Sequence, residues 1–120
     1  MTPFDEDWHL LSLARGVLEL LCAASPGRGG NARWRRLERL ATAAAEGVDH
    51  AVHRRTPGRY RRALRRTELL SAWLGRLELD GASAAPVPAA VLSRARKALV
   101  LQRALLEDLA AGRRVAPGRH

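Results

Sequence analysis

The chain has 120 residues and a formal net charge of +9, with 21 basic residues against 12 acidic ones. This length suits one compact domain, and an apolar fraction of 47% argues against intrinsic disorder. One cysteine excludes an internal disulfide, and one cysteine with four scattered histidines argues against a structural zinc site. Abundant Ala, Leu and Arg, with few β-branched and aromatic residues, argue against a β protein.

No targeting or membrane segment is expected. Residues 5–7 are Asp-Glu-Asp, whereas signal peptides and transit peptides begin with positive charge. The best apolar stretch, residues 10–24, contains Arg15 and Glu19 and is too short to span a bilayer. We therefore expect a cytoplasmic protein that makes no contact with a membrane.

Clusters of Pro, Gly and small polar residues divide the chain at 25–31, 56–58 and 80–88. The segments between them have no proline in their interiors, and we predict one helix in each, over residues 5–24, 32–55, 57–79 and 88–111. Short links between amphipathic helices predict an all-α fold, an antiparallel up-down-up-down four-helix bundle. The bundle would occupy residues 1–112, followed by a basic flexible tail over 113–120.

The first predicted helix begins with acidic residues, where the helix dipole favours negative charge. Apolar residues recur along it at helical spacing, and we expect these to face the core: Trp8, Leu11, Leu18 and Leu21. Other leucines lie beside this stripe, so the helix is predicted to be buried on more than one side.

The other three predicted helices each carry a core seam, and the first two have spacing 3-4-3-4-3. Thr56 followed by Pro57 is typical of a helix start, with Thr56 as the N-cap. Gly112 is expected just beyond the end of the last helix. The seams are Trp34, Leu37, Ala41, Ala44, Val48, Ala51; then Tyr60, Ala63, Thr67, Leu70, Leu74, Leu77; then Leu92, Ala95, Leu99, Gln102, Leu105, Leu109.

The positive charge is concentrated in one part of the chain. Residues 28–66 carry twelve arginines against three acidic residues, a net +9 that equals the charge of the whole chain. These arginines form one cluster at the start of the second helix and one around the turn into the third. The clusters are Arg33, Arg35, Arg36 and Arg39, and then Arg54, Arg55, Arg59, Arg61, Arg62, Arg65 and Arg66.

This clustering predicts nucleic-acid binding. Like charges repel at i,i+4 spacing when no anion is present, and arginine forms bidentate contacts with phosphate. The two clusters lie toward opposite ends of the second helix, roughly 30 Å apart, which suits an extended polyanion. We expect RNA or DNA as the partner, bound through phosphates with little sequence specificity. The alternative is a solvated surface or one that docks an acidic protein, since a GC-rich genome also favours arginine.

Other candidate functional sites have weaker support in the sequence. Glu46, His50 and His53 share a helix face that would suit a metal, but no second helix supplies partner ligands, so a solvated flank is the stronger interpretation. Cys22 is predicted to be a buried small apolar residue. Residues 25–30 lack the ending of a phosphate-binding loop. We predict a non-enzymatic protein without a cofactor.

The aromatic residues are expected mainly in the core. Trp8, Trp34 and Trp73 fall on or beside the apolar stripes, which favours the core or a subunit interface. Tyr60, at the basic turn, is the one aromatic residue expected to be able to stack on a base, although it also begins the seam of the third helix.

A stretch from the basic turn through the third helix resembles a known family. It comprises Arg54-Arg55-Thr56-Pro57-Gly58-Arg59-Tyr60 and Leu69-Leu70-Ser71-Ala72-Trp73-Leu74-Gly75-Arg76-Leu77. This stretch is similar to the accessory variability determinant of diversity-generating retroelements. That branch is related to the bacterial four-helix bundle proteins encoded in intervening sequences of large-subunit rRNA genes. Residues 44–47, Ala-Ala-Glu-Gly, match only the end of an Asn-Ile-Ala-Glu-Gly-like run usual in the second branch, so both branches stay open.

The resemblance implies a homopentameric ring of bundles. Its basic surface would bind a reverse transcriptase together with template RNA or cDNA, and would support mutagenic copying. The alternative that the resemblance leaves is a homo-oligomeric interaction scaffold of the intervening-sequence type, without a direct role in nucleic-acid binding.

Overall fold

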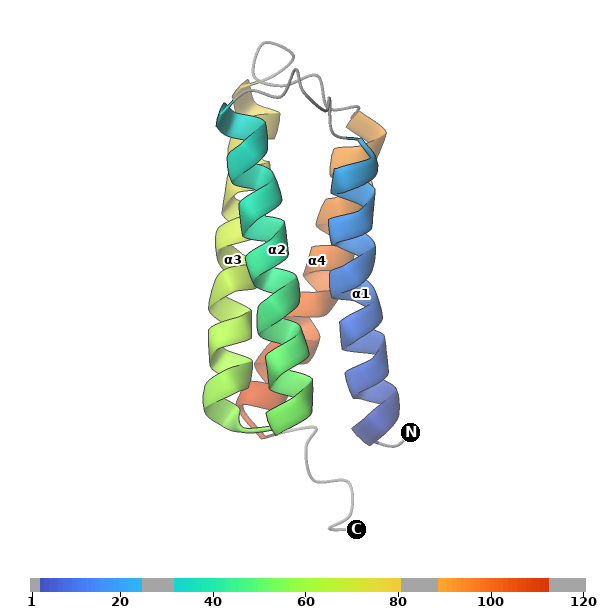
Figure 1. The fold of residues 1–120 in the computed structure, drawn as a ribbon, viewed down its shortest axis with the longest axis vertical. Helices are drawn as coiled ribbons and strands as arrows, with labels where there is room; N and C mark the ends of the chain where they lie inside the picture. The colour runs from blue at the N-terminus through green and yellow to red at the C-terminus, as the bar shows by residue number, and fades with distance from the viewer. Residues whose placement is uncertain (1–2, 25–31, 81–88, 113–120) are drawn as a thin grey trace.

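The protein is a four-helix bundle, as seen in a computed structural model that describes residues 3–24, 32–80 and 89–112. No strand occurs within those ranges, which confirms the predicted all-α class. Each helix boundary lies within two residues of the predicted one. The helices are α1 (Pro3–Ala23), α2 (Ala32–Arg54), α3 (Pro57–Asp80) and α4 (Ala89–Ala110) (Figure 1). The predicted first link, most of the third and the basic tail lie outside the described residues.

Consecutive helices pack side by side, and α4 packs back against α1, so the four helices enclose one central core (Figure 1). Arg15 of α1 pairs with Asp49 of α2, and Arg66 of α3 donates a hydrogen bond to the Ala43 carbonyl of α2. Every residue of the predicted seams on α2, α3 and α4 is buried, as predicted from their spacing.

The predicted seam on α1 is wrong except at Leu21, which is buried as expected. Trp8 is 70% exposed, and the buried stripe instead contains Leu10, Ala14, Val17 and Leu21. The apolar band on this helix is so wide that spacing alone admits more than one seam. The buried stripe begins at Asp7. Because a charged residue is not expected in a core, the sequence pattern does not reveal the first turn of this stripe. Trp8 therefore belongs to the surface.

A polar layer divides the core into two apolar clusters. The Gln102 side-chain amide donates to the Thr67 hydroxyl at 2.9 Å, and that hydroxyl donates to the Ala63 carbonyl at 2.9 Å. One cluster contains Trp34 and Leu74, and the other contains Leu10 and Leu106. A shift of α4 along α3 would leave the buried Gln102 amide nitrogen without this partner, so the pair helps to fix how the two helices face each other.

The turn between α2 and α3 is held by local hydrogen bonds. The Thr56 hydroxyl accepts from the Arg59 amide at 3.3 Å, which confirms the predicted N-cap. Arg55 adopts the left-handed region with φ of 54°, and its amide donates to the Ala51 carbonyl. Gly112 beyond α4 also has a positive φ, 79°, as expected of a residue that follows a helix.

Within the described ranges, no helix has the length and apolar character needed to cross a bilayer.

Candidate nucleic-acid interface

Stripes of side chains from α2 and α3 meet along one side of the bundle. The Arg66 Nη1 atom donates to the Ala43 carbonyl at 3.2 Å, and the Arg36 guanidinium lies 4.9 Å from the centre of the Trp73 ring. Residues three or four positions along share the same side of each helix. We call this surface the α2–α3 face; it comprises Arg36, Leu40, Ala43, Gly47, His50 and Arg54 of α2, and Arg59, Arg62, Arg66, Leu69, Trp73 and Arg76 of α3.

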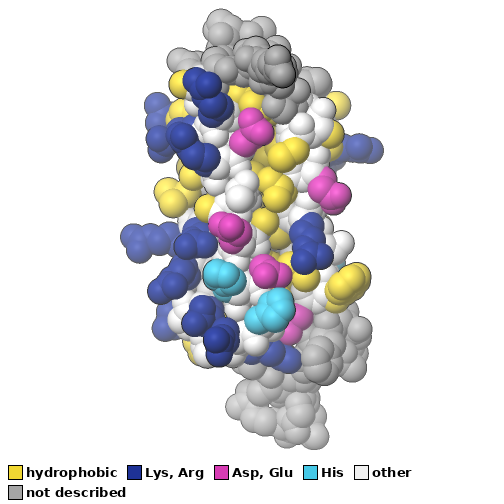
Figure 2. Space-filling model, in the orientation of Figure 1, with side chains coloured by type: hydrophobic (Ala, Val, Ile, Leu, Met, Phe, Trp, Pro, Cys, Tyr) yellow, Lys and Arg dark blue, Asp and Glu magenta, His cyan; other side chains and the backbone are white. Residues whose placement is uncertain are grey.

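The α2–α3 face carries six arginines and no acidic residue. Acidic side chains lie at the other helix contacts: Asp49 pairs with α1, and Glu68 pairs with Arg103 of α4 at 3.3 Å. Figure 2 shows basic side chains gathered along the side formed by α2 and α3, with acidic and apolar side chains between α1 and α2. Positive charge therefore extends about 25 Å along this side of the bundle, the rise from Arg59 to Arg76.

Most of the predicted arginines are available to a ligand. In the part of the chain that the structure describes, no acidic residue forms an ion pair with Arg59 or with the exposed arginines of the two clusters. The side chain of Arg33 lies outside the described residues. The exposed side chains are Arg35, Arg36, Arg39, Arg54, Arg61, Arg62 and Arg65, whereas Arg59 is half-buried.

Arg55, predicted to bind nucleic acid, is engaged within the protein. Its Nε atom lies 3.3 Å from the Asp7 carboxylate, and the Tyr60 hydroxyl donates to the same carboxylate at 3.2 Å. Asp7 is buried, so the Arg55 charge is neutralised within the end of the bundle. Arg55 therefore links the α2–α3 turn to the start of α1. Its guanidinium group, unlike those of its exposed neighbours, is engaged within the protein.

Arg66 is also committed in part to helix packing. A Cβ atom at Gly47 would lie 3.1 Å from the Arg66 Cδ atom and 3.3 Å from the Ala63 Cα atom. Glycine at this position thus lets α2 and α3 approach closely and leaves room for the aliphatic part of the Arg66 side chain. The half-buried Arg66 is held across the contact by its hydrogen bond to Ala43.

The aromatic residue on this face is Trp73. Of the two roles that the sequence left open for Tyr60, its place in the core seam is confirmed, and its side chain is not exposed for base stacking. Tyr60 is fully buried, because its place in the core seam outweighs its position at the basic turn. Trp73 is half-buried, and its ring centre lies 5.3 Å from the Arg76 guanidinium as well as near Arg36. The signal for it was present in the sequence, since positions 59, 62, 66, 69, 73 and 76 each directly precede a core residue.

Burial raises the pKa of Tyr60 to about 12, and the neighbouring Asp7 carboxylate adds to this effect. This pKa lies above the 10.0 of an unperturbed tyrosine, so the folded protein holds the Tyr60 proton more tightly than the unfolded chain does. The resulting contribution to the free energy of unfolding is complete below pH 10 and is lost as the pH rises toward 12. Tyr60 is the one tyrosine of the chain, so the absorbance of tyrosinate reports it alone. We expect a native midpoint near 12 that falls in Asp7→Asn; a native midpoint equal to that of the denatured chain would contradict this burial.

The described residues offer no metal-binding cluster of three or more His, Cys, Asp or Glu side chains. His53 is exposed, and its Nδ1 atom donates to the Asp49 carbonyl at 2.7 Å. His50 is exposed on the next turn back. Cys22 is exposed, so its predicted burial is wrong; it lies on the outer side of the corrected α1 seam.

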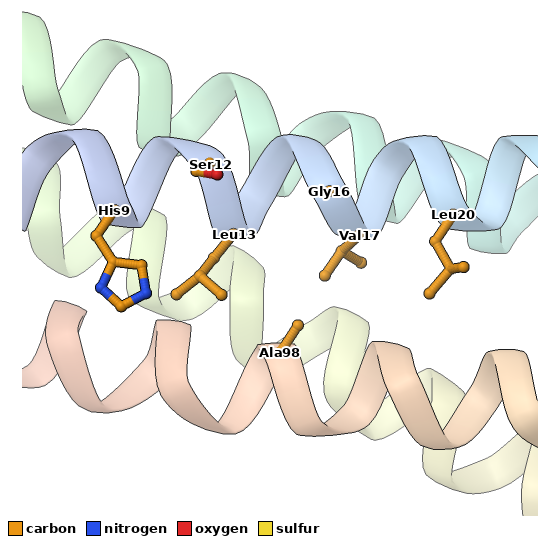
Figure 3. Close-up of a pocket in the computed structure, with 7 residues that line it drawn as sticks. All are labelled: His9, Ser12, Leu13, Gly16, Val17, Leu20 and Ala98. Carbon is orange, nitrogen blue, oxygen red and sulfur yellow. The ribbon is translucent and has the colours of Figure 1, made fainter.

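A shallow groove between α1 and α4 has a different character. In Figure 3, Leu13, Val17 and Leu20 extend from α1 toward Ala98 of α4, with His9 at one end. Among the described residues that line this groove, His9 is the one acidic or basic side chain. Its lining offers apolar contact rather than a set of groups suited to proton transfer or to phosphate.

No protein-family model, curated protein or solved structure matches the chain.

Proposed function

We propose that this protein is a non-enzymatic accessory protein that binds RNA or DNA through the α2–α3 face. The observation that supports this function is the row of six arginines without an acidic residue among them. Arg54, Arg59 and Arg62 have no described acidic partner, so their mutual repulsion is relieved by an external anion. A phosphate backbone supplies anions along a line, as this face supplies guanidinium groups.

For the bundle we propose antiparallel up-down-up-down topology. Two ion pairs of α1 support it: Asp7 with Arg55, the residue directly after α2, and Arg15 with Asp49 of α2. The earlier residue of α1 pairs with the later residue of the other segment, so α1 and α2 run in opposite directions. The basic face would then run lengthwise along one hairpin of the bundle.

The resemblance to the diversity-generating retroelement accessory family adds the identity of the protein partner. We propose a reverse transcriptase as that partner, with template RNA or cDNA as the bound nucleic acid, in the cytoplasm. The same resemblance is the basis for proposing a homopentamer.

A second candidate function is a homo-oligomeric interaction scaffold without a direct role in nucleic-acid binding. Exposed apolar side chains away from the basic face favour it, namely Trp8 on α1 and Val100 and Leu101 on α4. Such residues are typical of protein contact surfaces when they lie close together. In this case the arginines would dock an acidic protein.

Competition between polyanions separates the two functions. The full chain, stripped of bound nucleic acid by a high-salt wash, is titrated with a labelled RNA or DNA strand and challenged with polyglutamate. Nucleic-acid binding predicts that polyglutamate of equal charge competes poorly, because carboxylates along a peptide do not follow the spacing of phosphates. Tighter binding of polyglutamate than of either nucleic acid would support the scaffold instead.

A further inference from the structure

The α2–α3 face contains an apolar patch enclosed by arginines. Leu69 is 54% exposed, and Trp73 follows it by one turn on the same side of α3. Half-buried Leu40 lies on the facing stripe of α2. Arg36 and Arg76 cover the Trp73 ring at 4.9 and 5.3 Å. Arg62 lies three turns before Trp73, so the patch interrupts a row of positive charge.

Phosphate binding alone gives no reason for this patch. A phosphate group gains nothing from a leucine or an indole ring, and an exposed leucine in a phosphate site displaces a hydrogen-bond donor. A nucleobase, by contrast, stacks on an aromatic ring and on the plane of a guanidinium group. Trp73, with the Arg36 and Arg76 guanidinium groups near its ring, provides both kinds of surface in one place.

We propose that Trp73, Leu69, Arg36 and Arg76 form a base-stacking site, so that the α2–α3 face binds single-stranded nucleic acid in preference to duplex. This inference rests on the proposed function and adds the class of nucleic acid. Bases in a duplex are already stacked on one another, whereas an unpaired strand presents them to the protein. Arg59 and Arg62, about 16 to 21 Å from Trp73 along α3, would hold phosphates of the same strand.

The first test uses the unmodified protein and four probes of about 12 nucleotides, a length within the range of single-strand binding sites. The probes are an RNA strand, a DNA strand of the same sequence, the corresponding DNA duplex, and a DNA strand in which the bases are removed. Binding is followed by fluorescence anisotropy at one salt concentration. We expect one or both base-bearing strands to bind at least about 5-fold more tightly than the duplex and the abasic strand. Equal affinity for all four would overturn the base-stacking site.

The second test changes the protein. Trp73→Leu is expected to weaken single-strand binding about 5- to 100-fold and to leave duplex binding unchanged, whereas Trp73→Phe keeps most of the affinity. Trp8→Leu is the matched control, because it removes an exposed tryptophan outside the α2–α3 face. Circular dichroism shows whether each variant folds. If Trp73→Leu does not fold, the comparison of the base-bearing strands with the abasic strand, made with the unmodified protein, decides whether the base-stacking site exists.

Failures of the two proposals look different. If no probe binds, the proposed nucleic-acid function is wrong, and this inference falls with it. If the duplex and the base-bearing strands bind equally and Trp73→Leu matches Trp8→Leu, the base-stacking site is wrong while nucleic-acid binding stands.

Discussion

Replacing Arg59 and Arg62 together with glutamine is expected to weaken binding to an RNA strand about 10- to 50-fold near physiological salt. Both residues lie on the α2–α3 face near its turn end, and neither side chain has a described acidic partner. Each lost phosphate contact removes the release of one condensed counterion, which is where most of the affinity originates. The fold should tolerate the change, because it removes two like charges three residues apart.

Arg94→Gln with Lys97→Gln is the matched control for this double variant. It removes the same charge from one helix at the same i,i+3 spacing, from exposed side chains of α4 outside the α2–α3 face. Because net charge attracts RNA only weakly at physiological salt, we expect a loss of less than about 3-fold. Equal losses in the two double variants would show that affinity follows net charge and that the α2–α3 face has no special role.

Leu74→Ala is expected to lower the free energy of unfolding by about 2 to 5 kcal/mol. Leu74 is fully buried in the apolar cluster that also contains Trp34 and Leu37, so truncation leaves a cavity between helices. A loss of this size is a large share of the stability of a small domain. Urea denaturation followed by circular dichroism measures it.

The comparison variant is Leu69→Ala on the same helix. Leu69 is more than half exposed, so its truncation removes little buried apolar surface and should change the free energy of unfolding by less than about 1 kcal/mol. Similar losses at Leu69 and Leu74 would mean that the seam of α3 does not face the core as described. The same Leu69 variant also tests the base-stacking site independently of stability.

The helices and three of the four seams follow from the sequence because local rules and tertiary packing agree there. Proline and glycine mark the ends of α3 and the turn before it, and Leu and Ala repeat at a helical spacing that leaves one seam. On α1 several seams satisfied the same spacing, and the correct one begins with a buried aspartate. Its partners Arg55 and Tyr60 are 48 and 53 residues away in the chain, a separation that periodicity cannot bridge.

Only part of the candidate interface could be predicted, again because the sequence pattern does not reveal contacts between distant residues. Clustering located the arginines on α2 and α3, but it gave Arg55 and Arg66 the same weight as their exposed neighbours. Their differences come from tertiary contacts: an ion pair with Asp7 for Arg55, and a seat over Gly47 for Arg66. Trp73 lies on the α2–α3 face because, in this bundle, the residues of α3 that directly precede a core residue border α2.

The bundle thus presents surfaces of different chemistry. The α2–α3 face is positively charged and contains one aromatic ring, whereas the α1–α4 groove is mainly apolar. Under the proposed function, the α2–α3 face holds the polyanion and another side of the bundle is left for contact with protein. Mutations on the two sides are therefore expected to separate nucleic-acid binding from assembly.

The salt dependence of RNA binding tests the central claim most directly. The affinity of the full chain for a single RNA strand is measured over a series of salt concentrations, and log K is plotted against log salt. Contacts from Arg36, Arg54, Arg59, Arg62 and Arg76 predict a slope of about −3.5, which the Arg59 and Arg62 double variant reduces in size by about 1.4. A flat plot would contradict binding through phosphates on the α2–α3 face.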